Sequence, residues 1–212
     1  MGMTGVFRHP EPAGAPVVAF DFDGTLTCRD SFVAFLTWRA GATAAAAGAL
    51  RLLPAALTYA VRRDRGALKA AVADRLLGPV RRARLQADAQ RFCDERYDSL
   101  MRSDAVACWD DWRRRGARLF IVTASPDILV APFARRLAAD GLIGTRLAFD
   151  REERFTGCLD GPNCRGPEKV SRLRAELGPT LTLQAAYGDT DGDREMLALA
   201  ETPGLKVFTA RP

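Results

Sequence analysis

The chain has 212 residues, enough to bury one good hydrophobic core and hardly enough for two full domains. Its composition, 48% hydrophobic and 27% charged, excludes a disordered or fibrous protein. The net charge of +5 mildly favours anionic ligands, but the arginines are scattered in short runs at 62–63, 81–82 and 113–115, so we expect no nucleic-acid partner.

The cysteine and histidine content argues against two kinds of site, a zinc site and a disulfide framework. The five cysteines form no C-x-x-C pair, and the single histidine, His9, lies near the N-terminus, which argues against a zinc site. No disulfide framework is indicated, so we predict a cytoplasmic protein. Residues 1–16 are rich in proline and glycine and contain no apolar run, so we expect a disordered tail rather than a signal peptide.

Short apolar runs that end in polar or glycine residues recur along the chain. The first, at 17–20, stops abruptly at two acidic residues, as expected of a strand buried on both faces. The predicted strands are 17–20, 119–122, 181–187 and 205–208, and the predicted helices between them are 127–139, 168–177 and 194–201. Strands that alternate with helices predict an α/β fold with a doubly wound parallel sheet.

Two stretches interrupt this alternation. Residues 31–105 show only helical patterns, although a simple strand–helix–strand unit would need one helix there. We therefore predict an all-helical cap inserted over the carboxyl end of the first strand. Residues 149–166 are predicted to form a β-hairpin or flap. The resulting division is a tail at 1–16, a catalytic core of 17–30 plus 106–212, and a cap at 31–105.

Two carboxylates follow the first strand directly, in the segment DFDGTLT. An Asp-Gly pair can form an ordinary turn. However, Asp21 and Asp23 stand at the mouth of an apolar strand, where carboxylates are costly to desolvate unless a cation accompanies them. Mg²⁺ is a hard cation that takes oxygens from carboxylates, carbonyls and phosphates, and open α/β sheets bind ligands at the carboxyl ends of their strands. We therefore expect a Mg²⁺ site at this place.

The same segment resembles the first signature of the haloacid dehalogenase-like (HAD) superfamily of phosphohydrolases, and three further resemblances follow in the expected order. Thr123, which ends the strand FIVTAS, is similar to the second signature, a hydroxyl that binds phosphoryl oxygens. Lys169 in GPEKV is similar to the third, a fixed cation. Asp189 and Asp193 in GDTDGD resemble the fourth, an acidic loop that completes the metal site.

The resemblance implies a phosphatase that works through an aspartyl-phosphate. Asp21 would attack phosphorus as the nucleophile, and Asp23 would protonate the leaving group and then take a proton from water. Mg²⁺ would be held by the carboxylates of Asp21 and Asp189 and by the backbone carbonyl of Asp23.

The remaining signature residues would bind or orient. Thr123 and Lys169 would hold the phosphoryl oxygens, and Asp193 would orient Lys169 or a metal-bound water. Ser125, two residues beyond Thr123, is a further candidate for substrate contact.

The predicted cap resembles that of the phosphoserine phosphatase-like branch (subfamily IB), in which an acidic residue at the start of the cap binds the substrate. Asp30 stands about there, and it is equally suited to cap the helix that begins at Ser31. The segment NCRGPEKV looks closest to phosphatidylglycerophosphatase C-like proteins. Asn163 and Arg165 in it would touch the substrate head group, or would form only a flap tip before a helix.

The sequence does not identify the substrate or the acceptor of the phosphoryl group. The same residues could serve a phosphotransferase or phosphomutase, or a phospho-acceptor regulatory module, although an adjacent general base at Asp23 argues against a long-lived phosphoaspartate. The predicted partner is a phosphorylated small molecule or a phospholipid head group. Residues 42–61 would form a packed cap helix or would rest on an anionic membrane surface. Monomer and homodimer are both compatible with the sequence.

Overall fold

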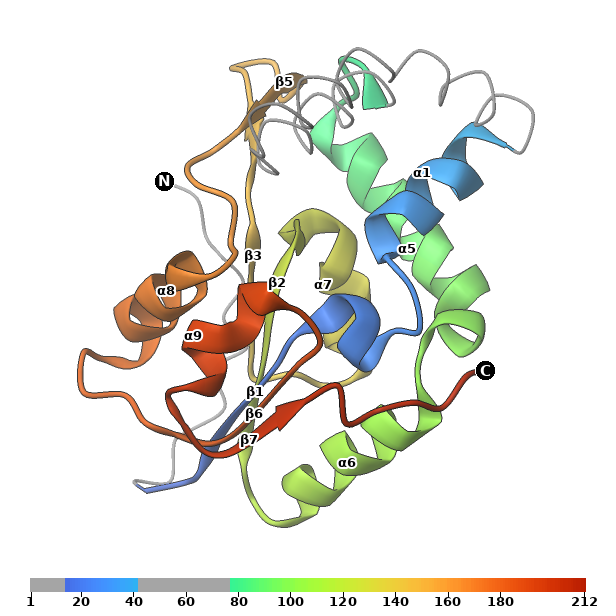
Figure 1. The fold of residues 1–212 in the computed structure, drawn as a ribbon. Coiled ribbons are helices and arrows are strands. Elements are labelled where there is room, and N and C mark those ends of the chain that lie inside the picture. The colour runs from blue at the N-terminus through green and yellow to red at the C-terminus, as the bar shows by residue number, and fades with distance from the viewer. Residues whose placement is uncertain (1–13, 42–76) are drawn as a thin grey trace.

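A computed structural model describes residues 14–41 and 77–212 of the chain (Figure 1). At its centre is a five-stranded sheet in the order β3-β2-β1-β6-β7, in which all neighbouring strands run parallel. The strands are β1 (Val17–Phe20), β2 (Arg118–Pro126), β3 (Gly141–Thr145), β6 (Leu183–Gly188) and β7 (Ala200–Leu205).

Helices cover both faces of this sheet. Figure 1 shows α8 and α9 on one face, and α6 and α7 on the other. The helices of the described residues are α1 (Ser31–Ala40), α5 (Arg82–Leu100), α6 (Ser103–Arg114), α7 (Asp127–Arg136), α8 (Pro167–Leu177) and α9 (Arg194–Leu197). The prediction of an α/β fold with a doubly wound parallel sheet is therefore confirmed.

The apolar runs form strands because both of their faces are buried. Along β2, Leu119 and Ile121 belong to the larger hydrophobic cluster, on the side of α6 and α7. Phe120 and Val122 belong to the smaller cluster, which includes Leu173 of α8. Alternate side chains point to opposite faces of a strand, so a continuous apolar run is what a central parallel strand requires.

The register of the central strands brings three strand ends to one edge of the sheet. Phe20, the last residue of β1, pairs with Ile121 of β2 and with Tyr187 of β6. The polar residues that follow Phe20, Ile121 and Tyr187 along the chain therefore meet at the carboxyl edge, where open α/β sheets bind their ligands.

The prediction of a last strand at 205–208 was wrong. β7 ends at Leu205, and Phe208 lies beyond it with its ring 5.2 Å from that of Tyr187. β7 lies at the edge of the sheet, where Glu201, Thr202 and Pro203 are exposed, so it lacks the apolar signature of a central strand.

Sequence patterns also missed β3 and overextended two helices. β3 contains two glycines, and a Cβ at Gly141 would lie 2.4 Å from Cε1 of Phe120 on β2. Close packing, rather than β-branched composition, therefore specifies this strand. The helix predicted at 127–139 ends at Arg136, and the one predicted at 194–201 ends at Leu197.

A hairpin is present, but it begins before the predicted stretch 149–166: β4 (Leu147–Phe149) pairs antiparallel with β5 (Phe155–Leu159). Of the region expected to form a cap, α1 and α5 are described, whereas 42–76 lie outside the described residues, and with them the segment 42–61. The division into core and cap stays a prediction. Among the helices that the structure describes, none has the length and hydropathy to span a bilayer.

Candidate active site

The chain turns sharply after β1 and carries the two leading acidic residues. The backbone N–H of Asp21 donates to the carbonyl of Tyr187 on β6 at 2.8 Å, which extends the ladder by one residue. A short turn, Phe22–Leu26, follows, and Gly24 in it has a φ of 79°. A Cβ at Gly24 would lie 2.2 Å from Oδ2 of Asp189. Glycine is therefore required both for the left-handed backbone and for the approach of the loop after β6.

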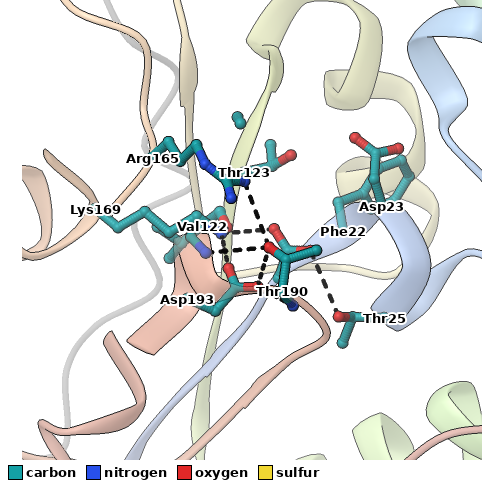
Figure 2. Close-up of polar contacts among 12 residues, drawn as sticks. Phe22, Asp23, Thr25, Val122, Thr123, Arg165, Lys169, Thr190 and Asp193 are labelled. Carbon is teal, nitrogen blue, oxygen red and sulfur yellow. Dashed lines mark hydrogen bonds and ion pairs between the residues drawn. The ribbon is translucent and has the colours of Figure 1, made fainter. Parts of the chain in front are cut away.

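Lys169 lies at the centre of a buried network of charges (Figure 2). It projects from the first turn of α8, and its Nζ donates to Oδ1 of Asp21, Oδ1 of Asp193 and the carbonyl of Val122, each at 2.6 Å. All three residues that carry these charges are buried. An ammonium group has three N–H donors, so Lys169 is held on every side by protein acceptors. The predicted nucleophile, cation and orienting residue thus meet in one place.

The pKa values of these three carboxyl groups are shifted in different directions. Burial raises the pKa of Asp21 to about 7, although the Lys169 ammonium acts to lower it. Burial and the neighbouring Asp193 also raise the pKa of Asp189. Burial acts in the same sense on Asp193, but Lys169 and hydrogen bonds from Thr190 hold its pKa below the ordinary value. For Asp21 and Asp189 burial outweighs the Lys169 ammonium, so a further positive charge beside them would favour their ionised forms.

The donor set at this edge fits a divalent cation. Oxygens of Asp21, Asp189 and Asp193 lie within 4.8 Å of one another. The buried Oδ1 of Asp189 has no hydrogen-bond partner among the described residues. Asp193 is engaged on both sides, because Oδ1 bonds Lys169 and Oδ2 accepts from the backbone N–H of Thr190 at 2.9 Å. Hard carboxylate oxygens on Asp21 and Asp189 suit Mg²⁺, and Asp193 suits the orientation of Lys169.

Asp23 points away from this network in Figure 2. Its Oδ1 accepts a hydrogen bond from the backbone N–H of Ser31 at 2.6 Å, and its Oδ2 accepts from the hydroxyl of Ser125. Thr123 is buried, and its Oγ1 accepts from the backbone N–H of Ser125 at 3.0 Å. The structure therefore places Ser125, predicted to contact substrate, behind Asp23 with its hydroxyl on that carboxylate.

A cavity of about 510 Å³ opens over these residues. Its lining contains the predicted residues Asp21, Asp23, Thr123, Lys169, Asp189, Asp193, Asp30, Asn163 and Arg165, together with Arg29, Arg102, Thr190, Gly24, Cys28 and Ala124. The cavity thus brings together the residues of all four signatures and both residues of the predicted flap.

The outlying predicted residues have structural contacts of their own. Asp30 caps α1, since its Oδ1 accepts from the backbone N–H of Val33 at 2.8 Å, and it also lines the cavity. Both interpretations of Asp30 therefore agree with the geometry. Asn163 has its Oδ1 2.8 Å from the Thr145 hydroxyl at the end of β3, which anchors the loop before α8.

Arg29, Arg102 and Thr190 are among the cavity residues that were not predicted. Arg102 stands between α5 and α6, and its guanidinium donates to the carbonyls of Thr27 at 3.2 Å and Ala210 at 2.7 Å. Nothing local in the sequence marks Arg29 or Arg102 as site residues, since tertiary packing brings them here. Thr190 could have been predicted, because it lies inside the acidic segment GDTDGD. Its side chain caps the turn Asp191–Asp193.

Comparisons with known proteins agree with this geometry. Residues 18–198 match the sequence model of the haloacid dehalogenase-like hydrolase family. The chain is 53% identical over 210 residues to protein CicA of Caulobacter vibrioides, which covers 99% of this chain and 92% of that one. It is 32% identical over 194 residues to a phosphoserine phosphatase of Halobacterium salinarum, covering 88% and 83% of the two chains.

Solved structures share the fold at lower identity. A protein of unknown function from Bordetella pertussis Tohama I superposes with a TM-score of 0.74 at 23% identity, covering 89% of this chain and 88% of that one. A phosphoserine phosphatase in its apo form superposes with a TM-score of 0.58 at 17% identity, covering 90% and 86%. The family match, with the relatives that cover nearly all of the chain, shows that the chain belongs to the haloacid dehalogenase-like hydrolases, in their phosphoserine phosphatase-like branch.

Proposed function

We propose that this hydrolase is a Mg²⁺-dependent phosphomonoesterase that forms an aspartyl-phosphate on Asp21. The proposal rests on two neighbouring features: a buried Asp21 that is hydrogen-bonded to Lys169 at 2.6 Å, and a buried Oδ1 of Asp189 that has no hydrogen-bond partner among the described residues. A nucleophilic carboxylate must be ionised to attack, and both a fixed ammonium and a bound cation favour that form.

Asp21 acts first in the proposed reaction. One of its carboxylate oxygens forms a bond to phosphorus while the bond from phosphorus to the ester oxygen breaks. Asp23 gives its proton to the departing oxygen. Lys169 and the Thr123 hydroxyl balance charge on the phosphoryl oxygens, where most of it accumulates.

Asp23 then reverses its role. It takes a proton from water, the water oxygen bonds to phosphorus, and the bond to Asp21 breaks to release orthophosphate. The Asp189 carboxylate and the Asp21 carboxylate would hold Mg²⁺ between them, and this ion would supply positive charge against the phosphoryl oxygens. Hydrogen bonds from Ser31 and Ser125 hold the Asp23 carboxylate in a defined orientation at the cavity wall.

We propose a phosphorylated small molecule as the substrate. Support comes from the relative that is named a phosphoserine phosphatase and from Asp30, whose carboxylate at the cavity mouth suits an amino group. The lipid-phosphate alternative depends on residues 42–61, outside the described residues. Transfer to an alcohol instead of water would use the same core residues, and product analysis distinguishes the two.

The test is turnover of p-nitrophenyl phosphate by the full chain, with Mg²⁺ and after chelation, followed by a screen of phosphomonoesters. Activity that disappears with EDTA and returns with Mg²⁺ would support the proposal. Rates for phosphoserine are then compared with those for phosphatidylglycerophosphate in mixed micelles. An absence of turnover on every monoester at saturating Mg²⁺ would refute it.

A further inference from the structure

Arg165 occupies a fixed place beside the acidic loop. It lies in the short connection between β5 and α8, four residues before Lys169. The backbone N–H of Gly166 donates to the carbonyl of Gly192 at 2.8 Å, and the N–H of Arg165 donates to that of Asn163 at 2.8 Å. This connection is therefore tied directly to the loop that carries Asp189 and Asp193.

The side chain of Arg165 packs against Gly192. A Cβ at Gly192 would lie 2.4 Å from both Cζ and Nη1 of the guanidinium. Nη1 also lies 3.4 Å from the hydroxyl of Thr190. Figure 2 shows Arg165 among the residues of the network, and Arg165, Thr123 and Lys169 line the same cavity. Glycine at 192 is thus the feature that allows the guanidinium to reach this position.

The charge of Arg165 is not neutralised within the described residues. The 3.4 Å contact with Thr190 is the one polar contact of its guanidinium there, and no carboxylate pairs with it. Arg172 of α8 shows the contrast: it donates to Glu168, Gly144 and Pro162 at 2.6–2.7 Å. Most N–H donors of this half-buried guanidinium make no hydrogen bond to the described residues, and they face a cavity. Such a group favours the binding of an anion.

Lys169 alone cannot supply the hydrogen bonds and the positive charge that such an anion requires. Its three donors are taken by Asp21, Asp193 and the carbonyl of Val122. Around the predicted nucleophile, the carboxylates of Asp21, Asp189 and Asp193 outnumber this single ammonium. A phosphoryl group would bring further negative charge into the same place. Even with Mg²⁺ between Asp21 and Asp189, the three carboxylates and the phosphoryl group would carry more negative charge than the ion and Lys169 balance, which favours a further cation beside Thr190.

We propose that Arg165 binds the non-bridging oxygens of the phosphoryl group that is transferred, in the position that Gly192 allows. A guanidinium donates two parallel N–H groups to two phosphoryl oxygens, which an ammonium cannot do. This inference rests on the proposed function and deepens it. Arg165 would then contact the phosphoryl group, which all substrates share, and not the leaving group, which differs from one substrate to another.

The test measures orthophosphate, a ligand that has no leaving group. Binding of orthophosphate in the presence of Mg²⁺ is measured by calorimetry, and inhibition of p-nitrophenyl phosphate turnover is measured in parallel. Arg165→Met should weaken orthophosphate binding by roughly ten- to a hundredfold, the range for loss of a charge-assisted hydrogen bond. Arg165→Lys should recover only part of the loss. Arg174→Met, a change of the same kind at an exposed position of α8, should leave binding unchanged.

Gly192→Ala tests the position of the guanidinium without removing its charge. The added methyl group should displace Arg165 and weaken orthophosphate binding in the wild-type background. It should add no further loss to Arg165→Met, because two changes that act through one contact are not additive. Thermal unfolding of each variant checks that the fold is retained.

Two results would overturn the inference. One is unchanged orthophosphate affinity in a folded Arg165→Met variant, including the case in which only esters with a second acidic group lose activity. The other is an equal loss from Gly192→Ala in both backgrounds. The proposed function is judged separately, since it fails only if the wild-type chain hydrolyses no phosphomonoester, whereas orthophosphate binding is measured without turnover.

Discussion

The Asp23 carboxylate accepts a hydrogen bond from the backbone N–H of Ser31, the first residue of α1, at 2.6 Å. Its second oxygen accepts from the Ser125 hydroxyl at the end of β2. The proposed acid/base is therefore held jointly by the helix that begins the predicted cap and by a core strand. This arrangement separates the two leading carboxylates: Asp21 faces Lys169, and Asp23 faces the start of α1.

Ser125→Ala should slow turnover through its effect on Asp23. The variant removes a hydrogen bond to a carboxylate in a buried place, so we expect kcat to fall by roughly ten- to a hundredfold. The KM and the Mg²⁺ requirement should stay near their wild-type values, since Ser125 does not line the cavity of the described residues. Steady-state kinetics at varied Mg²⁺ measures both. Ser125→Thr, which keeps the hydroxyl, serves as the control. An increase in KM with kcat unchanged would show that Ser125 contacts the substrate instead.

Asp189→Ala should raise the Mg²⁺ concentration needed for half-maximal activity by more than roughly tenfold, because it removes a proposed metal ligand. Asp23→Asn should leave that requirement nearly unchanged, since the expected ligand at this position is a backbone carbonyl. Titration of activity with Mg²⁺ compares the two variants. A loss of Mg²⁺ affinity in Asp23→Asn as large as in Asp189→Ala would mean that the Asp23 side chain is a ligand.

Gly24→Ala should damage both the fold and the metal site. The φ of 79° alone costs a non-glycine residue about 1–2 kcal/mol, and the added Cβ would also press against Asp189. Gly116→Ala is a matched control, because Gly116 has a φ of 77° with no atom within 4 Å of an added Cβ. Chemical denaturation should show a loss of stability for both variants, whereas titration of activity with Mg²⁺ should show weaker Mg²⁺ binding only for Gly24→Ala. Equal Mg²⁺ titrations for the two would contradict the close approach of Gly24 to Asp189.

The C-terminal residues are fastened by Asp104 at the start of α6, which accepts from the backbone N–H groups of Thr209 and Ala210 at 2.7 and 2.9 Å. Burial acts to raise the pKa of Asp104, but these hydrogen bonds lower it overall.

A carboxyl group whose pKa is lower in the folded state stabilises the fold above its unfolded pKa and loses that contribution as the pH falls through its folded pKa. Asp104→Asn should therefore be less stable than the wild type at pH 7, by less than about 1 kcal/mol because solvent screens the group. The difference should vanish in acid. Thermal melts across pH 2–7 measure it, and a difference that grows toward low pH would contradict this account.

Local sequence signals predicted the parts of the molecule that local chemistry specifies. β1 and β2 could be predicted because a central parallel strand must be apolar on both faces, and the acidic residues beyond them because they break those runs. β7 and β3 could not: an edge strand with Pro203 tolerates polar residues, and Gly141 is present because Phe120 occupies the space of a side chain.

The site shows the same division. The predicted signature residues lie in order along the chain and meet at one sheet edge, which the parallel topology ensures. Arg102 was missed because it reaches the cavity from the junction of α5 and α6, held by the carbonyls of Thr27 and Ala210. The position of the Arg165 side chain depends on the absence of a side chain at Gly192. These residues are 27 positions apart in the sequence, so no local pattern predicts this contact.

The central claim is that the phosphoryl group passes through Asp21. The Asp23→Asn variant is mixed with p-nitrophenyl phosphate and Mg²⁺, quenched in acid, and digested for mapping by mass spectrometry. This leaving group needs little protonation, whereas release of the phosphoryl group needs the base, so phosphoenzyme should accumulate. The account predicts a phosphoryl group on the peptide that contains Asp21, and turnover reduced roughly 10³-fold or more in Asp21→Asn. A phosphoryl group on a different residue, or near-native turnover by a deamidation-checked Asp21→Asn, would contradict it.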